Sequence, residues 1–294
     1  MNIVISNVIG GLGNQMFQYA AGRSLSMKRG VQLKLDISGF ANYSLHQGFE
    51  LERVFTCSVK FASGADVRRM LGWQSRSAAS RILLRPSMAI FRRKGFIVEP
   101  HFNYWQGIND APPESYLSGY WQSEKYFFGA AVQIRTDFTF RSLLNSRNAE
   151  VAEQMQRGNA ISLHVRRGDY ANNSKTTANH GLCSLEYYRS AIQYVIERVE
   201  QPSFYIFSDD SAWVRENMKM DFPCHYVDHN QGAESFNDMR LMSLCKHHII
   251  ANSSFSWWGA WLNPNPDKIV VAPRKWFAND NDVSDLFPSG WVTL

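Results

Sequence analysis

The residues best suited to chemistry follow a short apolar run near the middle of the chain. The run at 160–165 is rich in branched side chains and predicts a buried parallel strand. His164, Arg166, Arg167 and Asp169 lie at its end. Ligands of open α/β sheets bind at the carboxyl ends of the strands, and two neighbouring guanidinium groups there favour a phosphate or a carboxylate. The alternative is a structural Arg–Asp ion pair that ties down a loop.

A glycine-rich turn near the start of the chain is a second candidate anion site. Residues 2–9 predict a first strand, and a helical pattern that ends near Arg29 follows the turn. The turn contains Gly10, Gly11 and Gly13, followed by Asn14 and Gln15. Backbone N–H groups of such a turn, together with the positive end of the helix, attract anions. The turn lacks the Lys of a phosphate loop, which disfavours a nucleotidase built on it.

Polar side chains also follow two later predicted strands. The strand at 203–208 ends in Asp209 and Asp210, and the strand at 247–251 ends in the polar run 252–254. Strands and helices alternate from residue 160 onward, which predicts a parallel sheet with helices on both faces. Because the carboxyl ends of parallel strands meet at one edge of the sheet, we expect the three polar clusters to converge.

The first half of the chain predicts fewer elements. Strands are expected at 31–36, at 102–105 and within the aromatic run 115–123. Tyr120 and Trp121 in that run have rings suited to stacking on a sugar, and ordinary core aromatics are an equally good interpretation.

Length and cysteine content limit the class of protein. A chain of 294 residues predicts two domains of about 150 residues each. The four cysteines are widely separated and show no CxxC spacing, which argues against a zinc site or a disulfide framework and favours a reducing cytoplasm. No secretory leader and no membrane-spanning stretch is predicted.

The net charge of +5 is concentrated in one segment. Residues 66–94 contain eight basic residues and one acidic residue, interleaved with apolar side chains. The remainder of the chain is slightly acidic, which argues against a nucleic-acid partner. The segment predicts basic helices that either contact an anionic membrane surface or attract an acidic substrate. A solvated basic face packed on its apolar side is the alternative.

Four stretches together resemble the α1,2-fucosyltransferase family, which moves L-fucose from GDP-fucose to a galactose 2-hydroxyl. The stretches are 10–19, 119–127, 164–170 and 252–261. The resemblance implies an α/β, GT-B-like fold with two Rossmann-like domains facing across a cleft. Residues 1–157 would form the acceptor-side domain, including the basic helical segment 66–94, and residues 158–294 the GDP-fucose-binding domain.

The resemblance also implies roles for individual residues. Arg166 would contact the β-phosphate as the catalytic cation, with Asn14 near the reacting sugar and Asp169 also assigned to catalysis. His164 would contact the guanosine and Asp238 the guanine N–H groups. The full set implied for substrate binding is His164, Arg167, Asp238, Ser253, Ser254, Phe255, Gly11, Gly13, Gln15, Tyr120 and Trp121.

The resemblance implies an inverting single displacement that needs no metal or other cofactor, although Asp280-Asn281-Asp282 has the DxD form of metal-dependent glycosyltransferases. The general base is not identified: the candidates are Asp36, Asp169, Asp209, Asp210 and Glu234. Expected partners are GDP-fucose and a β-galactoside acceptor, lipid-linked if the product is a surface polysaccharide, with peripheral contact to the inner membrane. A non-catalytic module that binds a nucleotide sugar or glycan is the alternative function.

Overall fold

The computed structural model describes residues 2–42, 47–75, 79, 82–167, 181–279 and 281–294. Two compact units form: Met1–Arg141 with Asp282–Leu286, and Ser142–Asn281 with Phe287–Leu294. The division falls at 141 rather than at the predicted 157, because Ala152 and Met155 belong to a core cluster of the second unit. Residues 282–286 join the first unit, where the Ser123 hydroxyl donates to the Asp285 carbonyl at 2.6 Å.

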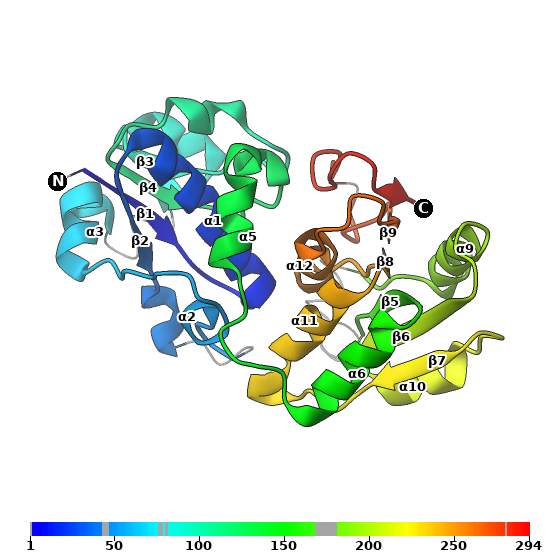
Figure 1. The fold of residues 1–294 in the computed structure, drawn as a ribbon. Coiled ribbons are helices and arrows are strands. Elements are labelled where there is room, and N and C mark those ends of the chain that lie inside the picture. The colour runs from blue at the N-terminus through cyan, green and yellow to red at the C-terminus, as the bar shows by residue number, and fades with distance from the viewer. Residues whose placement is uncertain (1, 43–46, 76–78, 80–81, 168–180, 280) are drawn as a thin grey trace. The chain divides into compact units, whose positions relative to one another are not determined.

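The first unit is built on a parallel four-stranded sheet in the order β2-β1-β4-β3 (Figure 1). Its strands are β1 (Ile3–Asn7), β2 (Gln32–Asp36), β3 (Phe96–Val98) and β4 (Ser115–Ser118). Its α-helices are α1 (Leu12–Arg29), α2 (Leu51–Val54), α3 (Gly64–Leu71) and α5 (Ala131–Asp137). Short 3₁₀ turns lie at Ser38–Asn42, Gly72–Ser75, Pro86–Phe91, Gln106–Asp110, Glu124–Tyr126 and Phe128–Ala130.

Alternation along β1 assigns the two faces of this sheet. Ile3 and Ile5 share a core cluster with Met70 and Leu71 of α3. Ser6 points to the other face, where its hydroxyl donates to the Gln18 carbonyl of α1 at 2.8 Å. Successive side chains of a strand point to opposite faces of the sheet. β1 therefore contacts α3 on one face and α1 on the other.

The predicted strand at 102–105 is wrong, and the strand lies earlier, at β3. The aromatic character that suggested a strand has another cause: the Tyr104 ring packs against Tyr126 at 4.9 Å. The Trp105 N–H donates to the Tyr126 hydroxyl at 2.9 Å, which takes this backbone out of any ladder. The predicted basic helical segment contains α3 and two of the 3₁₀ turns.

The second unit contains a parallel six-stranded sheet in the order β10-β9-β8-β5-β6-β7. The strands are β5 (Asn159–Val165), β6 (Pro202–Ser208), β7 (Cys224–Val227), β8 (His247–Ile249), β9 (Val270–Ala272) and β10 (Val292–Thr293). The helices are α6 (Ser146–Gln156), α9 (Leu185–Ile196), α10 (Ser211–Asn217), α11 (Phe236–Leu244) and α12 (Ser254–Leu262), with a 3₁₀ turn at Gly232–Glu234. The strand–helix alternation expected from the sequence is confirmed.

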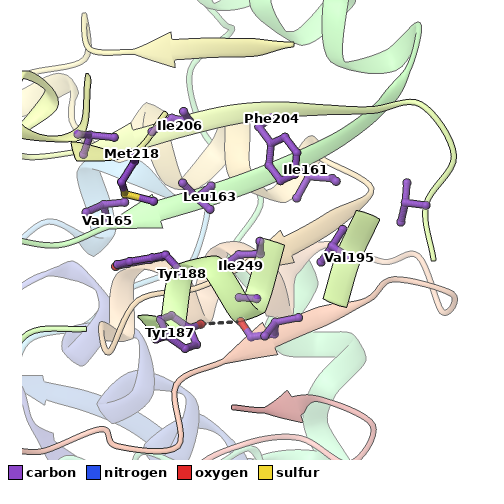
Figure 2. Packing of buried hydrophobic residues seen from close by; sticks show 14 residues of the cluster. Ile161, Leu163, Val165, Tyr187, Tyr188, Val195, Phe204, Ile206, Met218 and Ile249 are labelled. Carbon is purple, nitrogen blue, oxygen red and sulfur yellow. Dashed lines mark hydrogen bonds between the residues drawn. The ribbon is translucent and has the colours of Figure 1, made fainter. Parts of the chain in front are cut away.

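Alternation along β5 fixes where its polar side chains point. Ile161, Leu163 and Val165 pack with residues of α9 and α10 in one core cluster (Figure 2). The Tyr187 hydroxyl of α9 donates to the Ile250 carbonyl at 2.6 Å. Its longer bond, to the Val271 carbonyl at 3.2 Å, is the dashed line in Figure 2. The intervening β5 residues therefore face the side covered by α6 and α11.

In both sheets the strand order reverses at a central strand. β5 lies between β6 and β8, and β1 lies between β2 and β4. Loops that leave the carboxyl ends of such strands run in opposite directions and open a binding site between them. The reversal selects the segments after β5 and β8 in one unit, and after β1 and β4 in the other.

Across the described residues, no helix combines the length and apolar character needed to cross a membrane. The four cysteines, Cys57, Cys183, Cys224 and Cys245, are all free thiols.

Close packing of α12 on α11 depends on Gly259. A Cβ atom there would lie 2.9 Å from Met242 Cβ, an atom that cannot rotate away. We expect Gly259→Ala to lower the free energy of unfolding in urea by about 1–2 kcal/mol, because overpacking outweighs the better helix propensity of alanine. Gly158→Ala is the matched control, since nothing lies within 4 Å of its Cβ position. Equal stability of the two variants would contradict this account.

Candidate functional site

Arg166 follows β5 and is held by an acid that follows β6. The parallel register pairs Val165 with Ser208, which brings the next residues of the two strands together. Arg166 Nε lies 3.2 Å from Asp209 Oδ2, and both side chains are about one-quarter exposed. Asp209 Oδ1 accepts from the Arg167 backbone N–H at 2.8 Å. A carboxylate bound to both residues orients the guanidinium of Arg166 at the sheet edge.

Arg167 contacts side chains of the same unit, on α10 and just before it. Its guanidinium carbon lies 3.6 Å from the centroid of the Trp213 ring, and its Nε is 3.8 Å from Asp210 Oδ2. Trp213 belongs to α10, so Arg167 packs toward that helix. The ion pair considered for these arginines is thus present, with Asp209 and Asp210 as the acids. Asp169, which was predicted to take part, lies outside the described residues.

His164 occupies the face of β5 opposite Leu163, and only 5% of it is exposed. Its ring centroid is 6.1 Å from that of Phe255 at the start of α12. Burial and the neighbouring Arg166 lower the pKa of His164, so the imidazole is neutral at physiological pH. Nδ1 is buried and has no hydrogen-bond partner among the described residues. A neutral imidazole can offer one hydrogen bond there to a ligand.

The start of α12 provides backbone donors after β8. Ser253 is the N-cap, and its hydroxyl accepts from the Phe255 N–H at 3.3 Å. N–H groups of the first helical turn lack partners within the helix and favour an anion. The two expected serines and Phe255 thus lie at this helix start, and Phe255 lies beside His164. The three predicted strand-end clusters converge, as far as their residues are described.

Asp238 lies on α11, on the face of the sheet that His164 shares. Its Oδ1 accepts from Asn230 Nδ2 at 2.8 Å, and Asn230 in turn bonds Asn148. Burial raises the pKa of Asp238 to about 7. A ligand with paired N–H donors would stabilise the ionised form of such a carboxylate.

In the first unit Gln15 builds the glycine turn. Gln15 is fully buried. Its Nε2 donates to the carbonyls of Gly10 and Gly48 at 2.9 and 2.7 Å, and its Oε1 accepts from the Glu50 N–H at 2.9 Å. These bonds use both amide protons within the first unit, and the substrate contact of Gln15 stays a prediction. Gly10 has φ +82, a conformation that favours glycine.

The segments after β1 and β4 meet as the strand order requires. Gln122 Nε2 donates to Asn14 Oδ1 at 2.8 Å, and Gln18 Nε2 donates to the Gly119 carbonyl at 3.2 Å. The two aromatic candidates differ: Tyr120 is 44% exposed, whereas Trp121 is completely buried. Trp121 is therefore a core aromatic, the alternative that the sequence left open, and Tyr120 retains an accessible ring.

The carboxylates considered as a general base have internal partners where they are described. Asp36 accepts from the Tyr116 hydroxyl at 2.7 Å and from the Ser38 N–H at 3.0 Å. Glu234 accepts from Asn237 Nδ2 at 2.9 Å. Asp209 and Asp210 pair with the two arginines, as described above.

Sequence analysis missed Glu99, which accepts from the backbone N–H groups of Tyr120 and Trp121. The sequence offered little signal for it. The strand was expected at 102–105, so Glu99 was not seen as a residue that follows a strand.

Of the DxD sequence, the structure describes Asn281 and Asp282. Asp282 accepts from the Ser284 N–H at 2.9 Å, and Asp280 lies outside the described residues. Within the described residues no group of three or more His, Cys, Asp or Glu side chains could hold a metal ion.

Two parallel α/β sheets, each with polar residues at its reversal of strand order, correspond to the GT-B-like class expected from the sequence. The chain belongs to glycosyl transferase family 11, which matches residues 101–294. The resemblance seen in the four motifs is thereby confirmed.

Two related proteins match over 97% or more of the chain. An α-1,2-colitosyltransferase of Escherichia coli is 37% identical and covers 100% of this chain and 99% of its own length. The O-antigen biosynthesis glycosyltransferase WbnK of Escherichia coli is 34% identical and covers 97% and 98%. Among solved structures, the α-1,6-fucosyltransferase NodZ, soaked with GDP-fucose, has a TM-score of 0.56 at 18% identity and covers 90% and 93%. That likeness concerns the fold.

Proposed function

We propose that this glycosyltransferase moves L-fucose from GDP-β-L-fucose to the 2-hydroxyl of a terminal β-galactoside, forming an α1,2 linkage. The observation that carries the proposal is Arg166, fixed by Asp209 at the reversal point of the second sheet in a family 11 chain. The α-1,2 linkage of the colitosyltransferase and the O-antigen role of WbnK support this linkage and a place in bacterial surface glycan synthesis.

The second unit would bind the nucleotide and the first unit the acceptor. Arg166 would neutralise charge that develops on the β-phosphate as GDP leaves, with the first-turn amides of α12 near Ser254 as further donors. These groups are in place before the reaction, so little reorganisation is needed. We propose that this countercharge replaces a metal ion, that Asn14 lies near the reacting sugar, and that the anomeric centre inverts in one displacement.

The test is turnover of GDP-fucose with lactose, read as released GDP and as product linkage. We expect α1,2-linked product that is insensitive to EDTA, and a loss of about 100-fold or more in kcat for Arg166→Lys, which cannot form the same bidentate contact. Arg198→Lys, at an exposed position two residues after α9, is the control. Binding of GDP-fucose without turnover under all conditions would favour the non-catalytic module, and activity that requires manganese would refute metal independence.

A second donor is favoured by the colitosyltransferase relative. Colitose is L-fucose without its 3-hydroxyl group, so both donors present the same GDP to the second unit. A site built to hydrogen-bond that hydroxyl would reject the deoxy sugar strongly, whereas an apolar site would accept it. Comparison of kcat/KM for GDP-fucose and GDP-colitose, at equal acceptor concentration, decides between the two.

The titration of Asp238 makes GDP binding depend on pH. The pKa of about 7 means that the free protein holds a proton on Asp238 in mildly acidic solution. Guanine offers two N–H donors that need the ionised carboxylate, so binding releases this proton. We expect the affinity for GDP to rise by up to about tenfold per unit between pH 6 and 7 and to level off by pH 8.

Calorimetry over this range checks the prediction against two variants. Asp238→Asn should weaken binding at pH 8 and remove the pH dependence, apart from that of the GDP phosphates. Asp267→Asn, at an exposed position, should behave as the unmodified protein. An unchanged pH profile in Asp238→Asn would refute the contact with guanine.

The segment 66–94 supports the proposal of contact with an anionic membrane surface. Apolar side chains that are 41–84% exposed lie there: Trp73, Ile82, Leu84, Ile90 and Phe91. The exposed basic residues among them are Arg68, Arg69, Arg85, Arg93 and Lys94. Met70, Leu71 and Leu83 already fill the core of the first unit. The outward apolar residues are thus additional to those that pack the sheet, as in a surface that enters the lipid interface.

Cosedimentation with vesicles of phosphatidylglycerol and phosphatidylcholine tests this contact. Replacing Arg68, Arg69, Arg93 and Lys94 with Gln should reduce binding roughly a thousandfold, since each basic residue contributes about 1 kcal/mol. Arg92 is left intact because its Nε donates to the Leu83 carbonyl at 2.7 Å. The control replaces Arg147, Arg157, Arg198 and Lys219, exposed on the second unit. Equal binding by both variants, or binding to phosphatidylcholine alone, would refute the proposal.

A further inference from the structure

The turn after β4 contains an aromatic residue in a costly conformation. Trp121 has φ +56, in the left-handed region that residues other than glycine avoid at about 1–3 kcal/mol. Its indole is fully buried and packs edge-on against Tyr126 at 5.2 Å. Strain of this kind persists only where the surroundings hold the backbone, and it concentrates at functional sites.

Glu99, one residue after β3, holds that backbone. Its Oε2 accepts from the Tyr120 N–H at 2.6 Å, and its Oε1 accepts from the Trp121 N–H at 2.9 Å. The carboxylate therefore has one oxygen for each of two consecutive amides. A Cβ atom at Gly119 would lie 2.4 Å from Glu99 Cβ, so the close approach requires glycine there.

The residue after the strained position reaches the glycine turn. Gln122 is 8% exposed, and its Nε2 donates to Asn14 Oδ1 at 2.8 Å. This bond fixes which end of the Asn14 amide is the acceptor that points to Gln122. The Asn14 Nδ2 donor lies over Gly10, 2.8 Å from where a Cβ atom there would be. The orientation of Asn14 thus depends on a side chain placed by the strained turn.

We propose that Glu99 is a positioning residue for glycosyl transfer: its grip on the amides of Tyr120 and Trp121 places Gln122, which orients Asn14. The inference rests on the proposed function, in which Asn14 lies near the reacting sugar. The proposed role is indirect: the Glu99 carboxylate takes no proton from the acceptor and does not contact it. All the groups involved belong to the first unit.

The ionisation of Glu99 supplies a readout for this role. Burial raises its pKa to about 7, against the two backbone hydrogen bonds, which lower it. Burial, and then the charge of Glu99, raises the pKa values of Tyr120 and Tyr126, so both stay neutral. A protonated Glu99 has one oxygen that bears hydrogen, which weakens one of the two bonds to the turn. Both hydrogen bonds from the turn to Glu99 are therefore at full strength only above about pH 7.

The experiment is a double-mutant cycle in kcat on the full chain, with GDP-fucose and lactose at saturation. We expect Glu99→Gln and Gln122→Ala each to lower kcat about tenfold, the effect of one lost hydrogen bond, with the affinity for GDP within twofold of the unmodified protein. The double variant should lose no more than either single variant, because both act through Asn14. Glu52→Gln, an exposed carboxylate on α2, is the control for charge.

Further measurements separate positioning from general support of the fold. An acidic limb near pH 7 in kcat should be present in Glu52→Gln and absent in Glu99→Gln. Multiplicative losses in the double variant, or retention of the limb, would overturn the proposal. If Glu99→Gln does not fold, Gln122→Glu decides: it keeps the size and removes the donor, so unchanged kcat refutes the path to Asn14. An unmodified protein inactive with every donor would instead refute the proposed function.

Discussion

Parallel pairing on both sides of one central strand is the constraint on which the rest of the structure depends. β5 carries β6 on one side and β8 on the other, and its register with β6 sets Val165 beside Ser208. The residues that follow these two are Arg166 and Asp209. They form an ion pair in which Arg166 Nε lies 3.2 Å from Asp209 Oδ2. Geometry of the sheet, more than local sequence, thus fixes the cation at the sheet edge.

Burial shifts the pKa values of two ionisable groups of the second unit in different directions. His164 is kept neutral, because desolvation and Arg166 both oppose a second positive charge. Asp238 has a raised pKa, so its charge is costly until a donor arrives. Arg166 keeps its charge under all these conditions. Under the proposed function, the permanent cation would meet the β-phosphate of a nucleoside diphosphate, the neutral ring its guanosine and the carboxylate the guanine N–H groups.

In the first unit, hydrogen bonds hold two turns in fixed positions relative to each other. Gln15 uses its whole amide within the glycine turn, and Gln18 reaches the turn after β4. Glu99 also holds the turn after β4, because its carboxylate accepts from the Tyr120 N–H. Preorganisation of this kind costs stability where Trp121 is strained, and it spares reorganisation during a reaction. The second unit thus contains a charged site, and the first unit contains a rigid pair of turns.

The sequence by itself determined the classes of element and the motifs. Period-two and period-3.6 patterns are local, so the apolar run before Arg166, the helix after Gly13 and the strand–helix alternation could all be predicted, together with the family. Tertiary structure alone decided the partners. Asp209 pairs with Arg166 because β6 is the neighbour of β5. Trp121 is buried whereas Tyr120 beside it is exposed, and Glu99 binds the backbone of a turn about twenty residues later in the chain. Such contacts join residues distant in sequence, and strand order and register, which no local pattern encodes, select them.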